Sequence, residues 1–161
     1  MGGLQAHGIA ARLPGRFEGQ IFRRQSTGTV AMPVAQFATF PLPAQIGDFG
    51  GGAVELMDPT DIFVVLFEYG PESLGRALFA RRGMPRQLGS SDFQPFTLRR
   101  GLLGQSGTQW FFTEAGRPFT LYAVLGSHVG RARLLPELNL LLLGITVHAP
   151  VTTSGAPPGT D

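Results

Sequence analysis

The chain has 161 residues, 43% of them hydrophobic, and it contains 13 phenylalanines and no cysteine. This length suits one domain whose core is large enough to fold without metals or disulfides, and the missing thiols exclude disulfides, cysteine nucleophiles and zinc–sulfur sites. All 13 basic residues are arginine, against 11 carboxylates, so the formal net charge is only +2. The arginines form scattered pairs rather than a cluster, and the composition therefore does not favour nucleic-acid binding.

The sequence contains neither a targeting segment nor a membrane span that we can identify. Residues 1–11 lack the basic start and the continuous apolar stretch of a signal peptide. The most apolar window, 134–147, is shorter than the ~20 apolar residues that cross a bilayer, and Pro136 and Glu137 interrupt it. We therefore expect a cytoplasmic protein.

Alternating apolar residues predict three strands near the start of the chain. The first is predicted at 9–13 and ends at Pro14, and 16–24 repeats the alternation, so the two are expected to form an antiparallel hairpin. A third strand is predicted at 34–40. Pro33 inside this apolar run predicts either an edge strand or a break.

The middle of the chain contains the clearest core strand. A glycine-rich loop at 47–52 precedes a short predicted strand at 53–57, and 58–61 reads as a turn. Residues 62–67 are β-branched or aromatic, apolar on both faces and bounded by turn residues. This pattern predicts a strand in the centre of a sheet.

Two helices are predicted, one in the middle of the chain and one near its end. The first spans 71–83, where Pro71 and Glu72 suit the first helical turn and the apolar residues fall on one face. The second spans 133–143 and leads into a short strand at 145–147.

Between the two predicted helices, an irregular stretch at 84–103 precedes a β-hairpin. Its strands are predicted at 108–113 and 118–125, with Gly116 at the position that needs a positive φ. Strands outnumber helices and hairpins dominate. This predicts an α+β fold, a mostly antiparallel sheet with two helices packed on it.

We expect one globular domain over residues 1–148. Residues 149–161 are rich in Pro, Gly, Ser and Thr, which predicts a disordered C-terminal tail.

Three sequence blocks carry a resemblance to known proteins. Gly47-Asp-Phe-Gly-Gly-Gly52, Gly70-Pro-Glu-Ser73 and Phe111-Phe-Thr-Glu-Ala-Gly-Arg117 resemble blocks of small uncharacterised proteins of high-GC bacteria. That resemblance implies no activity. The strand that ends in Leu13-Pro14, the late hairpin and the helix containing Asn139-Leu-Leu are also similar to the PsbP-like α/β/α sandwich and to mycobacterial lipoproteins of the LpqN type. Relatives of that fold are mostly non-enzymatic binding or assembly proteins, so this resemblance implies a binding function.

The residues that most often carry catalysis or bind metals occur without a recognisable pattern. His7, His128 and His148 lack metal-ligand spacing, and Ser127 beside His128 is not a dyad, because adjacent side chains on an extended segment point apart. Gly104-Gln-Ser-Gly107 misses the nucleophile-elbow spacing by one residue. We predict no cofactor and no metal.

Four residues, Asp48, Phe49, Glu68 and Arg117, are the candidates for binding. Asp48 and Phe49 lie in the glycine-rich loop, where an aromatic side chain either folds onto the core or projects as a contact. Glu68 closes the central strand, and Glu114 and Arg117 flank the hairpin turn; for each of these we expect a structural ion pair rather than catalysis.

These observations favour a non-enzymatic binding, interaction or assembly-accessory protein that acts through a sheet face or a loop, with a protein partner or by self-association. Two alternatives stay open. A hydrolase-like enzyme with an unrecognised site would bring a histidine within hydrogen-bond reach of a carboxylate in a cleft. An arginine-mediated nucleic-acid binder would gather its arginine pairs on one face.

Overall fold

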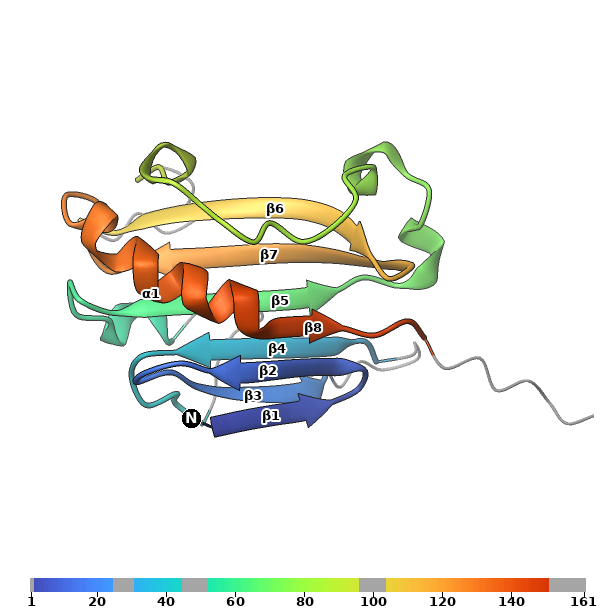
Figure 1. Cartoon of the computed structure of the whole chain (residues 1–161), viewed down its shortest axis with the longest axis horizontal. Helices are drawn as coiled ribbons and strands as arrows, with labels where there is room; N and C mark the ends of the chain where they lie inside the picture. The colour runs from blue at the N-terminus through green and yellow to red at the C-terminus, as the bar shows by residue number, and fades with distance from the viewer. Residues whose placement is uncertain (1, 25–30, 45–51, 96–103, 151–161) are drawn as a thin grey trace, which may run out of the picture.

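The computed structural model describes residues 2–24, 31–44, 52–95 and 104–150. Within these residues the chain forms two antiparallel sheets and one α-helix (Figure 1), which confirms the α+β class. Most of the predicted tail, 151–161, lies outside the described residues. No helix of the described part of the chain is long and apolar enough to span a membrane.

The larger sheet has five strands in the order β3-β4-β5-β7-β6. These strands are β3 (Glu18–Arg23), β4 (Pro33–Ala38), β5 (Ile62–Glu68), β6 (Ser106–Glu114) and β7 (Arg117–Leu125). The central position predicted for β5 is confirmed, and every residue of this strand is buried. β6 and β7 form the predicted hairpin, with Gly116 at a φ of 74°.

The smaller sheet places β2 (Ile9–Leu13) between β1 (Gly2–Ala6) and β8 (Ile145–Val147). The hairpin predicted between β2 and β3 is therefore wrong. A two-residue turn, with φ 53° at His7 and 76° at Gly8, pairs β2 with β1 instead, and β8 occupies its other edge.

Two hydrophobic clusters fill the two faces of the larger sheet. The first lies beneath α1 (Arg131–Gly144) and the smaller sheet, and its largest fully buried side chains are Ile9, Phe37, Ile62, Leu66, Phe93, Phe112, Phe119, Leu121, Leu125, Leu138 and Leu141. The second cluster covers the opposite face and comprises Val34, Ala38, Phe40, Ala53, Val54, Phe63, Val65, Phe67, Tyr122 and Val124.

The helix predicted at 71–83 is wrong. The chain forms two short 3₁₀ helices there, η2 (Pro71–Ser73) and η3 (Ala77–Phe79). Gly75 between them has a φ of 81°, in the left-handed region that a right-handed helix does not contain. After η3 the backbone of Arg82 pairs with that of Thr113 at the edge of β6, and a residue paired in this way cannot belong to an α-helix.

Two further predictions need correction. The strand predicted at 53–57 is a 3₁₀ helix, η1 (Val54–Leu56). β4 is not an edge strand, because it lies between β3 and β5, and Pro33 is tolerated as its first residue. The irregular stretch contains one more 3₁₀ helix, η4 (Ser90–Asp92), and Phe93 after it is fully buried.

Candidate functional site

Helix α1 has apolar side chains on its buried side and also on the side that faces away from the sheet, although it carries Arg131, Arg133, Glu137 and Asn139 as well. The side chains that face the sheet are Leu134, Leu135, Leu138, Leu141 and Leu142. On the opposite side Leu140 is 57% exposed and Leu143 is 61% exposed. Pro136, also exposed, lies one turn before Leu140, so the three residues form a line along the helix, here called the apolar stripe. The side of a surface helix that faces away from the core is usually polar, so an exposed apolar line on that side is unusual.

The apolar stripe ends beside a hollow on the outer face of the smaller sheet. Figure 1 shows α1 running directly into β8, which lies beside β2. The hollow has a volume of about 470 Å³ and is lined by Gly3, Leu4, Gln5, Ala10, Ala11, Arg12, Gly144 and Thr146. We call the apolar stripe and this hollow together the helix–sheet face.

Gly144 allows the end of α1 to approach β2 closely. A Cβ atom at this position would lie 2.6 Å from the carbonyl oxygen of Arg12, which is closer than real Cβ contacts occur. Glycine is therefore required where the helix joins the sheet, and its missing side chain leaves part of the hollow open.

The helix–sheet face is bordered by two arginines and by one neutralised carboxylate. Arg12 lies in the hollow and Arg133 lies one turn before Glu137, and both are exposed. Neither guanidinium has a hydrogen bond or an ion pair with another residue in the described part of the chain. Glu137 is held by Arg16, so the border of the face is positively charged.

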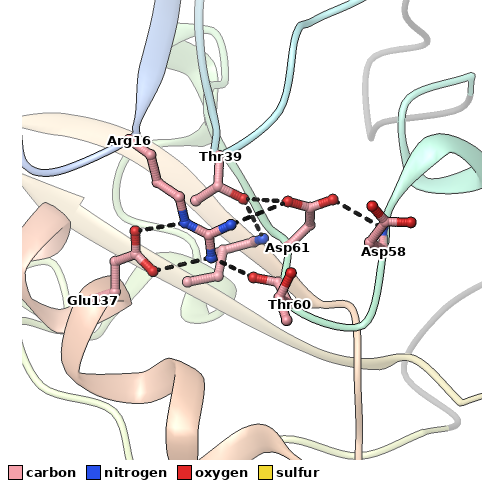
Figure 2. Close-up of polar contacts among 7 residues, drawn as sticks. Arg16, Thr39, Asp58, Thr60, Asp61 and Glu137 are labelled. Atoms are coloured by element: carbon pink, nitrogen blue, oxygen red, sulfur yellow. Dashed lines mark hydrogen bonds and ion pairs between the residues drawn. The ribbon is translucent and has the colours of Figure 1, made fainter.

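Arg16 fixes the position of α1 against the end of the larger sheet (Figure 2). It lies in the turn between β2 and β3, and its Nε and Nη2 atoms donate to the two carboxylate oxygens of Glu137 at 3.1 and 3.2 Å. Nη2 also donates to the carbonyl oxygen of Thr60, and Nη1 lies 3.5 Å from Oδ1 of Asp61. One side chain thus joins the helix, the β2–β3 turn and the start of β5.

Both carboxylate oxygens of Asp61 in this network accept hydrogen bonds from neighbouring residues. Its Oδ1 accepts a hydrogen bond from Thr39 Oγ1 at 2.9 Å, and its Oδ2 accepts one from the backbone N–H of Asp58 at 2.8 Å. Thr39 Oγ1 in turn accepts a hydrogen bond from the N–H of Ile62 at 2.9 Å. The network holds the turn before β5 in place, and it is structural rather than catalytic.

The structure brings the predicted site residues Glu68 and Arg117 together as a buried ion pair. Arg117 Nε and Nη2 donate to the two oxygens of Glu68 at 3.0 and 2.5 Å. Nη1 donates to the carbonyl oxygens of Gly8 and His148, at 3.2 and 3.0 Å, and Nη2 donates to that of His7 at 3.0 Å. All five N–H groups of the guanidinium are therefore used. The pair ties the β1–β2 turn and the end of β8 to the larger sheet, and no donor is left for a ligand.

Glu114 and Arg117 lie opposite each other across the hairpin turn, but they do not form an ion pair with each other. Glu114 accepts a hydrogen bond from the N–H of Met84 at 2.7 Å and lies 3.7 Å from Arg86 Nη2. Arg86 Nη1 donates to the carbonyl oxygen of Leu142 at 2.9 Å, in the last turn of α1. A cation here also complements the negative end of the helix dipole.

His128 contacts Ser106, which lies 22 residues earlier in the chain. The residues next to His128 in the sequence therefore do not indicate this contact. His128 Nδ1 lies 2.9 Å from Oγ of the fully buried Ser106, and its Nε2 lies 3.3 Å from Arg131 Nη1. Ser106 is fully buried, and no carboxylate of the described residues bonds to His128, so the pair lacks the exposed nucleophile and the third group of a serine-hydrolase site.

The other histidines and the acidic residues that the structure describes also form no catalytic or metal-binding arrangement. His7 accepts a hydrogen bond from Arg23 Nε at 3.1 Å, and no histidine of the described residues is bonded to a carboxylate. The described part of the chain holds no group of three acidic or histidine side chains suited to a metal ion. The predicted candidates Asp48 and Phe49 lie outside the described residues.

The described arginine pairs are distributed over separate elements. The pair 23–24 ends β3, the pair 81–82 runs beside the edge of β6, and Arg131 and Arg133 begin α1. The pair 99–100 lies outside the described residues.

Compared with models of protein families, with curated proteins and with solved structures, the chain has no significant match. Its function therefore has to follow from its own geometry.

Proposed function

We propose that this is a non-enzymatic binding protein that docks a segment of a partner protein on the helix–sheet face. The observation that carries the proposal is the apolar stripe, Pro136, Leu140 and Leu143, exposed in a line on the side of α1 that faces away from the sheet. Single exposed apolar residues are ordinary, but an aligned set beside a hollow is typical of an interaction site. The PsbP-like resemblance, itself still a prediction, implies the same class of function.

The charges at the border of this face define the chemistry of the partner segment. Arg133 and Arg12 lie at opposite ends of the apolar stripe, and neither has a partner among the described residues. The helix between 133 and 144 is about 16 Å long, the length of about five extended residues. The complementary segment is therefore about five apolar residues with a carboxylate at each end.

A second copy of the chain fits this face less well. If two α1 helices packed antiparallel, Arg133 of one copy would meet Arg12 of the other, and a parallel arrangement would bring each arginine against its own counterpart. Like charges would face each other in both cases, which disfavours self-association. The two alternatives from the sequence gain no support either, because Ser106 beside His128 is fully buried and the described arginine pairs are dispersed.

The test is a selection of random peptides displayed on phage, with wild-type protein as the target. We expect the selected peptides to share an apolar centre and flanking Asp or Glu residues. Leu140→Asp should weaken their binding about tenfold or more. The change removes apolar area that the peptide would bury, and the new carboxylate repels the acidic residues of the peptide. Leu78→Asp is the matched control, because Leu78 is also 57% exposed but lies on another surface.

Three results would overturn the proposal. One is that no peptides are enriched, and another is that the selected peptides bind the Leu140→Asp variant as tightly as wild type. The third is a concentration-dependent dimer in light scattering that Leu140→Asp abolishes, which would make a second copy the occupant instead.

A further inference from the structure

A second surface projects where the chain leaves β5 and turns toward the edge of β6. It consists of residues 71–82, here called the basic ledge, and ten of these twelve residues are exposed. In Figure 1 it is the green segment beyond the end of β5, well away from α1. The basic ledge is therefore a convex projection, separate from the helix–sheet face.

The base of the ledge is firmly attached to the larger sheet. Phe79 is buried, with its ring 5.1 Å from that of Tyr69 and 5.9 Å from that of Phe111. Thr113 Oγ1 donates a hydrogen bond to the carbonyl oxygen of Phe79 at 2.7 Å. The backbone N–H of Thr113 donates to the carbonyl oxygen of Arg81 at 2.8 Å. These contacts hold the projecting residues in fixed positions.

The exposed side chains of the ledge combine leucines with arginines. Leu74 is 40% exposed and Leu78 is 57% exposed. Arg76 and Arg82 have no side-chain hydrogen bond or ion pair within the described part of the chain, and Arg81 stacks over the ring of Trp110 at 4.7 Å.

The ledge carries as much positive charge as the whole protein. Its three arginines and one glutamate give it a formal charge of +2, and the net charge of the chain is also +2. Two of these cations, Arg76 and Arg82, have no side-chain partner in the described part of the chain, which makes the ledge complementary to an anionic surface.

We propose that the basic ledge binds the surface of an anionic lipid bilayer, with Leu74 and Leu78 in the headgroup region and the arginines against lipid phosphates. A stable interface with a folded protein buries about 800 Å² on each side and needs a matching surface. A bilayer instead closes around a small projection, and it satisfies apolar and cationic groups together. This binding goes beyond the proposed docking of a peptide segment and does not depend on it.

The test is co-sedimentation of the full chain with vesicles of about three parts phosphatidylcholine to one part phosphatidylserine. We expect binding that weakens with added salt and that is absent on vesicles of phosphatidylcholine alone. Each of Arg76→Gln and Arg82→Gln should weaken it about fivefold, and Leu78→Asp about tenfold or more. Leu140→Asp, with the same exposed fraction at its site, should bind as wild type does.

The proposal is overturned if neutral vesicles bind equally well, if no vesicle binds, or if Leu140→Asp weakens binding as strongly as Leu78→Asp. It is also overturned if polyglutamate or duplex DNA binds as tightly as the anionic vesicles and Leu78→Asp has no effect, because charge alone would then account for the binding. The phage selection contains no lipid, so the failure of one proposal is distinguishable from the failure of the other.

Discussion

At the scale of single residues, three arginines each join segments that are far apart in the sequence. Arg16 links α1 to the start of β5, Arg86 binds the last turn of α1, and Arg117 links the β1–β2 turn to β8. They differ in burial, since the Arg16 side chain is 43% exposed whereas that of Arg117 is 7% exposed. Solvent screens the first contact and not the third, so their contributions to the free energy of unfolding should differ.

Arg117→Leu is therefore expected to lower the free energy of unfolding by about 3–5 kcal/mol, because it leaves the buried carboxylate of Glu68 without its partner. Urea denaturation followed by circular dichroism measures the change. Arg16→Leu is the matched control, and it should cost about 1 kcal/mol or less. Equal losses for the two variants would show that the buried pair does not hold the β1–β2 turn and β8 as described.

Burial raises the pKa of Tyr122 to about 12. The folded state therefore keeps its phenolic proton at a pH where the unfolded chain, with a pKa of about 10, has lost it. The stabilisation is present in full below about pH 10 and is lost as the pH rises toward 12. We expect the free energy of unfolding of wild type to fall between about pH 10 and pH 12, and to fall less for Tyr122→Phe. An identical pH dependence in the two proteins would contradict this.

At the scale of elements, local periodicity predicted most of the regular structure. β5 was evident from its run of β-branched and aromatic residues, and the hairpin of β6 and β7 from its alternation and Gly116. α1 and β8 also lie where the sequence placed them, within two residues at either end. In each case the signal is contained in neighbouring residues.

Elements that depend on distant partners or on backbone geometry were not predictable in the same way. β1 begins with two glycines and has no clear alternation, and it is a strand because the turn at His7 and Gly8 pairs it with β2. β2 could not be paired correctly, because β8, its other neighbour, is more than a hundred residues away. The segment 71–83 has helical spacing, but Gly75 adopts a left-handed conformation.

The junction between α1, β8 and β2 is the element most sensitive to a small change. Gly144→Ala is expected to cost about 1–3 kcal/mol of stability, since the added Cβ would press against the carbonyl oxygen of Arg12. It should also weaken binding of the selected peptides by reshaping the hollow. Thermal denaturation measures the first effect, and Gly3→Ala is the control, because a Cβ there would meet nothing within 4 Å. Equal melting temperatures for the two variants would argue against the close junction.

At the scale of the whole molecule, the candidate site was only partly visible in the sequence. The ion pair of Glu68 was foreseeable, because a carboxylate that ends a buried strand needs a cation, although its identity as Arg117 needed the fold. The helix–sheet face was not foreseeable, because leucines lie on more than one side of 134–143 and Glu137 and Asn139 do not mark a single polar side. Which side is exposed depends on where the two sheets lie, and long-range contacts determine this.

The molecule carries two surfaces for which we propose binding, the helix–sheet face for an apolar segment with acidic ends and the basic ledge for an anionic bilayer. The most direct test of the first, which is the central claim, is an NMR titration of the ¹⁵N-labelled protein. The ligand is a synthetic peptide of about five apolar residues with two aspartates at each end, and the control peptide carries lysines instead. We predict that amide shifts concentrate at Arg12, Leu140, Leu143 and Thr146, and that the lysine peptide binds about tenfold more weakly. Shifts concentrated elsewhere, or equal affinity for the two peptides, would contradict the account.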